Sequence, residues 1–251
     1  MSLWASQRKL AYSLVFVVLL LIALGVPAFF FLYEKPSCVD GKQNQGELGV
    51  DCGGVCRNLC QAKQSPPIVV WAQKFKVAEG RYSIAAYIEN PNVSGSVNDV
   101  PYTFTLYDNK ASFIIEKKGT AYIPAGKSFV IVESGIVTGE RIPSRVDFSF
   151  DNEIFWELAS LPHTFKIANQ KISRETTSPR LDVTLQNEAL KDVLNIEVVA
   201  VLYDTSDNAL AVGRTYIDSI QRESEESVVF TWPAPFESKV SKIEVITRIL
   251  P

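Results

Sequence analysis

Residues 100–108, VPYTFTLYD, and residues 194–204, LNIEVVAVLYD, decide the fold. In each run, apolar side chains recur at every second position, as in a strand that turns one face toward a core. The predicted inward residues are Val100, Tyr102, Phe104 and Leu106 in the first run and Leu194, Ile196, Val198, Ala200 and Leu202 in the second. The second run becomes apolar on both faces near its end, which is typical of a central sandwich strand. Because similar short runs recur between turn residues and no convincing helix pattern follows residue 67, we predict a mainly β fold.

The two runs belong to an internal repeat with a period of 96 residues. The sequence LYD occurs at residues 106–108 and again at residues 202–204. Matching strand-like segments flank it in both copies, at 84–90 and 181–187, 128–132 and 227–231, and 145–150 and 242–248. A period this long exceeds that of solenoid repeats and fits tandem domains of about 90 residues each. We therefore predict two β-sandwiches, residues 66–160 and 161–251, after a polar linker.

This repeat resembles the FxLYD-type and late-embryogenesis-abundant type 2 β-sandwich families. In those families an Asn ends one strand, and the next long strand ends in Leu-Tyr-Asp. The matching residues are Asn90, Leu106, Tyr107 and Asp108 in the first copy and Asn187, Leu202, Tyr203 and Asp204 in the second. Phe104 matches the FxLYD phenylalanine, whereas the second copy has Ala200 there. The resemblance implies immunoglobulin- or fibronectin-like, seven-stranded sandwiches that serve binding or structure.

An apolar segment without charged residues, residues 11–33, lies near the N-terminus. As a helix it would span about 35 Å, enough to cross a hydrocarbon core of about 30 Å. Arg8 and Lys9 precede it, so the positive-inside bias places residues 1–10 in the cytoplasm and the C-terminal domains outside. A cleaved signal peptide is the alternative, but the apolar stretch is longer than the usual h-region and three Phe follow the best cleavage site. We expect an uncleaved, single-pass anchor that contacts the lipid bilayer through residues 11–33.

A cysteine-rich module is predicted at residues 36–61, which contain all four cysteines: Cys38, Cys52, Cys56 and Cys60. An even number of clustered cysteines outside the cytoplasm predicts two disulfides, and three pairings remain open. The segment has almost no apolar residues, so crosslinks would replace a hydrophobic core. Zinc is the competing interpretation, but Gly53-Gly54 disfavours a helix and the usual CxxC spacing is absent.

The same segment offers four oxygen-bearing side chains that suit calcium, namely Asp40, Asn44, Glu47 and Asp51. Their spacing does not match an EF-hand loop, and we favour a role in capping turns beside the neighbouring glycines. The pattern resembles a small cysteine motif of bacterial surface proteins. The residues that carry it are Cys38, Asp40, Gly41, Asn44, Glu47, Asp51, Cys52, Gly53, Gly54 and Cys56. The resemblance implies an envelope or surface setting and no catalytic role.

Patterns for catalysis or cofactor binding are missing from the sequence. The formal net charge is −3, so no basic field indicates a nucleic-acid partner. The one histidine, His163, follows Leu161-Pro162 at the junction of the repeats, and we interpret it as a linker residue. No GxSxG sequence or glycine-rich phosphate loop occurs. Trp71, Trp156 and Trp232 could stack on glycans, but we expect them to fill the sandwich cores or the interface between the repeats.

These observations predict a non-enzymatic, single-pass membrane protein that presents two β-sandwiches as an interaction or assembly module of the cell envelope. The cysteine-rich module would act as a stiff stalk. The expected partner is another envelope protein or a glycan. A glycan- or cell-wall-binding surface protein is the alternative, and an envelope hydrolase is a weaker one.

Overall fold

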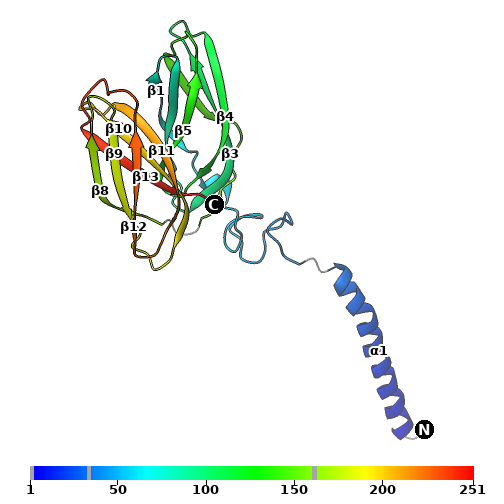
Figure 1. Cartoon of the computed structure of the whole chain (residues 1–251). Helices are drawn as coiled ribbons and strands as arrows, with labels where there is room; N and C mark the ends of the chain where they lie inside the picture. Colours follow the sequence, from blue (N-terminus) through cyan, green and yellow to red (C-terminus); the bar gives the residue numbers. More distant parts are fainter. Residues whose placement is uncertain (1–2, 33–34, 160–162) are drawn as a thin grey trace. The chain divides into compact units, whose positions relative to one another are not determined.

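The computed structural model describes residues 3–32, 35–159 and 163–251 of the chain (Figure 1). The chain divides into two compact units, Met1–Cys56 and Arg57–Pro251. The first contains the helix α1 (Leu3–Leu32), and the second contains a short 3-10 helix, η1 (Gln61–Lys63), and all the described strands. The predicted fold class is confirmed, because the described chain is mainly β with one N-terminal apolar helix.

Helix α1 is apolar along most of its length. Its segment Lys9–Phe29 has a mean hydropathy of 2.6 and none of it is buried in the protein. Pro27 lies inside the helix without ending it, although proline usually breaks a helix in water. Among the described residues this is the one helix long and apolar enough to cross a membrane, and its length and composition fit either a span or a signal sequence.

Both copies of the repeat form the same pair of antiparallel sheets. The first copy contributes β1 (Ile68–Ala78), β2 (Arg81–Glu89), β3 (Gly95–Tyr107), β4 (Phe113–Ile123), β5 (Ser128–Val137) and β6 (Arg145–Phe150). The second contributes β8 (Lys166–Ser173), β9 (Arg180–Gln186), β10 (Val193–Tyr203), β11 (Ala209–Ile220), β12 (Glu225–Thr231) and β13 (Lys242–Ile249). The sheet orders are β1-β2-β5 and β4-β3-β6 in the first copy, and β8-β9-β12 and β11-β10-β13 in the second. The described part of each copy thus has six long strands, whereas the resemblance implied seven; β7 (Glu157–Leu158) adds only a two-residue strand beside β3.

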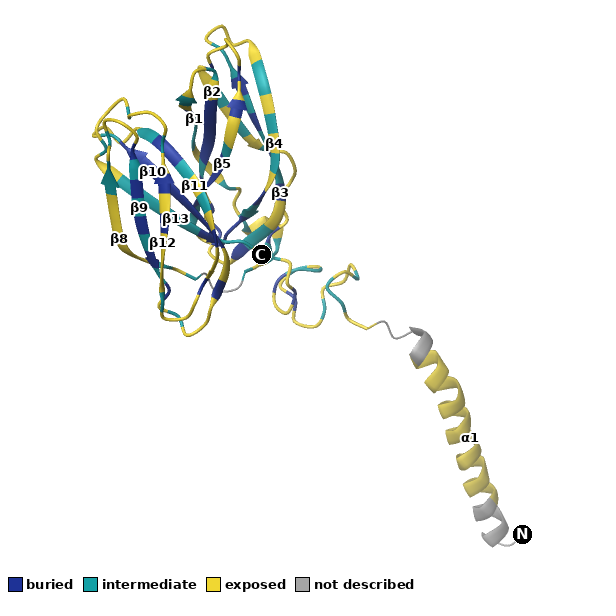
Figure 2. Cartoon of the chain, in the orientation of Figure 1, coloured by how far each residue is buried: buried dark blue, intermediate teal, exposed yellow. Residues whose placement is uncertain are grey.

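Each sandwich encloses its own hydrophobic core, visible as buried residues along the inner faces of the strands (Figure 2). Phe104 and Leu106 are fully buried in the first core, as the alternation in residues 100–108 predicted. Ile196 and Leu202 occupy the second core in the same way. The predicted inward face is therefore confirmed for both LYD strands over most of their length.

The prediction is wrong for Leu194, whose side chain is 59% exposed. Val193 points into the core instead and is 5% exposed. The reason is the backbone at Asn195, where a φ of +53° interrupts the alternation. Asp99, 96 residues earlier, has a φ of +51°, so both copies contain the same irregularity at the start of the long strand.

The LYD aspartates hold the turns that follow these strands. The backbone N–H groups of Lys110 and Ser112 donate to Asp108 Oδ1, both at 2.9 Å. The backbone N–H groups of Ser206 and Asn208 donate to Asp204 Oδ1 in the same way, at 2.7 and 2.9 Å. An aspartate at this position therefore fixes the turn by pairing backbone groups that the strands leave unpaired.

Residues 57–65 lie against the first sandwich, although the sequence suggested a cysteine module up to residue 61 and then a polar linker. Leu59 packs on the first core, and its N–H donates to the carbonyl of Trp156 at 2.9 Å. The N–H of Ser65 donates to Asn92 Oδ1 at 2.8 Å. The chain is thus fixed to the sandwich before β1 begins.

Candidate functional site

The two sandwiches share a third hydrophobic cluster, which joins one sheet from each. The buried residues come from β1, β2 and β5 on one side and from β10 and β11 on the other: Phe75, Ala85, Val130, Val132, Val199, Val201, Tyr203 and Val212. This junction explains why β10 is apolar on both faces near its end. One face fills the second core, and the other packs against the first sandwich.

Glu244 on β13 links the two sandwiches through tyrosine hydroxyls. Its Oε1 accepts a hydrogen bond from the hydroxyl of Tyr87 on β2 at 2.9 Å, and its Oε2 accepts one from Tyr203 on β10 at 2.9 Å. Burial and the neighbouring Glu244 carboxylate both raise the pKa of Tyr203, so its hydroxyl stays protonated and remains a donor. These charge-assisted bonds fix how the two sheets of the junction lie against each other.

A buried ion pair lies elsewhere on the same sheet. Arg248 on β13 donates from Nε to Glu197 Oε2 at 2.8 Å, and the two side chains are 8% and 3% exposed. Arg248 Nη1 also donates to the carbonyl of Tyr122 in the first sandwich at 2.7 Å. Its guanidinium lies 5.3 Å from the centre of the Phe129 ring. One arginine thus satisfies a buried carboxylate and binds the opposite sandwich.

Two hollows occur beside the junction. The apolar groove, which we name after lining residues such as Trp232 and Phe236, has about 600 Å³ and lies between residues 74–83 of the first sandwich and residues 209–212 and 232–237 of the second. Charged side chains, including Lys76 and Glu79, line it as well. The basic pocket, of about 520 Å³, is lined by Lys127 and by residues on both sides of the connection between the sandwiches, including His163 and Lys191. No sequence pattern indicated either hollow, because their lining residues lie far apart along the chain.

The three tryptophans that we considered as glycan platforms lie inward. Trp156 is 3% exposed and belongs to the first core. Trp71 packs against the junction cluster, 5.7 Å from the ring of Tyr87. Trp232 packs on the second core, and its indole N–H donates to the carbonyl of Val212 at 3.2 Å. The expectation that they fill the cores or the interface between the repeats is therefore confirmed.

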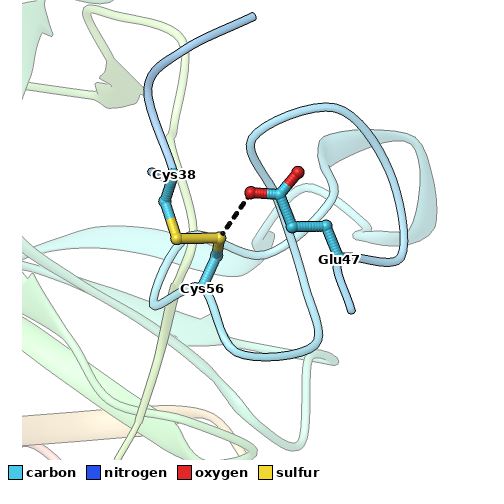
Figure 3. Close-up of side chains that lie close together, drawn as sticks. All are labelled: Cys38, Glu47 and Cys56. Carbon is cyan, nitrogen blue, oxygen red and sulfur yellow. Dashed lines mark hydrogen bonds between the residues drawn. A yellow bond between two sulfur atoms is a disulfide. The ribbon is translucent and has the colours of Figure 1, made fainter. Parts of the chain in front are cut away.

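The four cysteines of the predicted module form two disulfides. Cys38 is bonded to Cys56, with their Cα atoms 5.6 Å apart (Figure 3). Cys52 and Cys60 are disulfide-bonded as well, so the described chain contains no free cysteine. Disulfide sulfurs are not the thiolates that zinc requires, so the structure does not support the zinc interpretation.

A carboxylate is buried beside the Cys38–Cys56 bond. Glu47 is 6% exposed, and its Oε1 lies 3.1 Å from Cys56 Sγ, the contact dashed in Figure 3. Because a disulfide sulfur has no proton, this contact is not a hydrogen bond. Oε2 accepts the backbone N–H groups of Asn44 at 3.3 Å and Asp51 at 3.2 Å. Glu47 therefore acts as a local brace for the loop.

The four candidate calcium residues lie close together and are linked by the hydrogen bonds of turns. Asp51 accepts the N–H groups of Asp40 and Gly41, both at 2.9 Å, and Asp40 accepts the side-chain amide of Asn44 at 2.9 Å. Among the described residues, the one acidic or sulfur cluster close enough for a shared metal is Cys38, Glu47 and Cys56, and two of these are in the disulfide. The geometry fits the turn-capping interpretation. Asn44 Oδ1 is buried without a hydrogen-bond partner, and the calcium interpretation stays a hypothesis.

The disulfides can be checked directly by alkylation. A thiol reagent added to the unfolded full-length protein without reductant is expected to modify none of the four cysteines, because each is bonded. After reduction it should add four labels, counted by intact-protein mass spectrometry. Four labels without reductant would contradict the disulfide assignment.

Comparisons with known proteins identify no family for this chain. No protein-family model matches it, and no curated protein matches it. A glycosyl hydrolase family 2 member from Bacteroides cellulosilyticus has 13% identity and a TM-score of 0.23, over 67% of this chain and 26% of its own. Red sea bream transglutaminase has 11% identity and a TM-score of 0.20, over 71% of this chain and 31% of its own. The chain spans less than a third of the length of either protein, and similarity this low carries no functional argument.

Proposed function

We propose that this chain is a non-enzymatic, single-pass membrane protein that presents two β-sandwiches outside the cytoplasm as an interaction or assembly module of the cell envelope. The observation that carries the proposal is the bare apolar surface of α1, whose segment Lys9–Phe29 is 0% buried in the protein. Apolar surface of this extent needs lipid around it. The two disulfides support an oxidising environment for the rest of the chain. The cysteine module, which follows α1 in the sequence, is then the stalk.

The junction supports a binding role, because it fixes two sandwiches as one preorganised surface. The apolar groove, with Trp232 and Phe236 among its lining residues, is the surface we assign to a protein partner. The edge strands β4 and β8 are less suitable for strand addition, because both carry lysines, which discourage edge pairing. Trp156 is buried in the first core and Trp71 packs against the junction cluster, so neither offers an open platform for a glycan.

The role of His163 supports a non-catalytic assignment. Its ring packs edge-on against Phe165, with the ring centres 4.7 Å apart. A catalytic histidine needs a hydrogen-bonded acid or nucleophile, and no such bond to His163 occurs among the described residues.

The topology is tested by protease protection. The full chain with a C-terminal epitope tag is expressed in the inner membrane of a bacterial host. Protease added to intact spheroplasts is expected to remove the tag, and the untreated membrane-bound chain should keep its uncleaved mass of 27.9 kDa plus the tag. A tag protected until lysis would contradict the orientation, and a soluble shortened chain would show that α1 is a cleaved signal.

The partner surface is tested with a photo-crosslinking amino acid at two exposed positions. Ile142 is 68% exposed and lines the apolar groove, whereas Phe155 is 69% exposed and lies outside it. A discrete protein adduct is expected in intact membranes from position 142 and not from position 155. Equal labelling from both positions, or no adduct from position 142, would contradict the groove assignment.

A further inference from the structure

The basic pocket carries a second inference, independent of the proposed partner groove. The sandwiches meet here near the connection that joins them, and the pocket holds about 520 Å³. Lys127 lies in the turn between β4 and β5, Lys191 lies in the turn before β10, and His163 lies just before β8. The fold thus brings side chains from three distant segments to one hollow.

The charges in this pocket do not cancel. Arg57 is paired with Glu157 at 2.9 Å, and Arg248 is paired with the buried Glu197. Neither Lys127 nor Lys191 forms an ion pair with any carboxylate in the part of the chain that the structure describes. Among the described side chains, Lys127 and Lys191 are therefore the two cations of the pocket without an ion-pair partner, and the chain's last residue, Pro251, also lines the pocket.

Lys127 is held in place although it is half-buried. Its Nζ donates to the carbonyl of His163 at 2.7 Å. Burial lowers the pKa of Lys127, because its charged form is less well solvated at this position than in water. A partly buried ammonium group without a counter-charge costs free energy, and a bound anion would offset that cost.

His163 shows the same positive environment. Its Nε2 atom is buried and has no hydrogen-bond partner. Burial lowers the pKa of this imidazole, and the positive charges of Lys191 and Lys127 lower it further. An anion beside the two lysines would reverse part of this effect, because it would favour the protonated ring.

We infer that the basic pocket binds a small oxyanion, either a carboxylate or a phosphate group, held by Lys127 and Lys191. Ammonium groups act as point charges that accept either geometry. The volume is sufficient for one such group and its immediate carrier, such as a single acidic sugar or a phosphate ester. The pocket is open to solvent at its rim, where Lys191 is exposed.

The test uses the fact that the chain has a single histidine. Full-length protein in a non-ionic detergent is labelled with ¹³C-histidine, so that one imidazole signal reports on the pocket. Inorganic phosphate and acetate are titrated separately at constant ionic strength. A saturable shift of the His163 signal, together with a raised His163 pKa, is the expected result. Saturation by both anions, or by one alone, supports the inference and identifies the group preferred; saturation by neither overturns it.

Two pairs of substitutions separate a site from a general field effect. Lys191→Met is expected to weaken anion binding about tenfold, and Lys127→Met/Lys191→Met to abolish it and to raise the His163 pKa without anion. Lys110→Met/Lys239→Met removes the same charge from exposed lysines outside the pocket and should leave binding unchanged. Because Lys191 is exposed, the single variant should remain folded. Unchanged binding in that variant, or equal loss in the control pair, overturns the inference.

Discussion

Replacing Arg248 by methionine is expected to lower the free energy of unfolding by about 3–5 kcal/mol. The substitution leaves Glu197, whose side chain is 3% exposed, without its main counter-charge. It also removes the hydrogen bond to the carbonyl of Tyr122 in the first sandwich. The measurement is urea unfolding of the full-length protein in detergent, followed by tryptophan fluorescence, with Trp71 reporting on the junction.

Two further variants test whether the unpaired Glu197 carboxylate causes the loss of stability in Arg248→Met. Glu197→Gln/Arg248→Met removes the buried negative charge as well, and it should recover most of the lost stability. Arg145→Met breaks an ion pair to Asp147 in which both side chains are more than half exposed, and it should cost about 1 kcal/mol or less. If Arg248→Met costs no more than Arg145→Met, the buried pair is not a structural link between the sandwiches.

Local pattern predicted eight of the twelve long strands in the described chain. The alternation around Phe104 and Leu106 placed β3 correctly, and the six flanking segments fall on β2, β5, β6, β9, β12 and β13. No segment was assigned to β1, β4, β8 or β11. The prediction from alternation is wrong at Leu194, because a positive φ at Asn195 shifts the alternation by one residue. Asparagine tolerates this conformation better than most residues, but its presence alone does not show that the conformation occurs.

The junction was predictable only in part. Val199 and Val201 indicated that the second face of β10 is buried, but not which surface covers it. Glu197 and Glu244 follow ordinary strand alternation in the sequence, and their burial depends on partners from distant strands. The resemblance to the FxLYD and late-embryogenesis-abundant type 2 families, the two domain boundaries and the envelope setting stay predictions.

The structure nevertheless shows what the two motif asparagines, Asn90 and Asn187, do in the fold. Asn90 donates from Nδ2 to the carbonyls of Gly95 and Pro124, at 2.8 and 2.7 Å. Asn187 donates from Nδ2 to the carbonyls of Lys191, Ile220 and Gln221, at 2.9, 3.2 and 3.0 Å. Each buried amide therefore ties the loop that follows one strand to a second loop. In both copies, the Asn before the LYD strand holds two loops together through its side-chain amide.

Asn187→Ala is consequently expected to destabilise the protein by about 3 kcal/mol, since a buried group left unpaired costs about 1–3 kcal/mol. Asn187 is 0% exposed, so water cannot replace its amide without opening the loops. The thermal midpoint should fall by about 6–12 °C, at about 2–4 °C per kcal/mol for a domain of this size. Asn187→Asp keeps the shape but replaces the donating NH₂ with oxygen, so it should cost at least as much. Asn208→Ala removes an exposed asparagine amide and should change the midpoint far less.

The same substitution in the first copy tests whether the repeat is structural. Asn90→Ala is expected to cost about as much as Asn187→Ala, because Asn90 is 4% exposed and also accepts the N–H of Asn92 at 3.0 Å. Asn92 in turn binds Ser65, so this variant should also expose residues 57–65 to protease under conditions in which Asn187→Ala does not. If Asn90→Ala leaves the stability unchanged while Asn187→Ala lowers it, the repeated motif holds only one of the two sandwiches together.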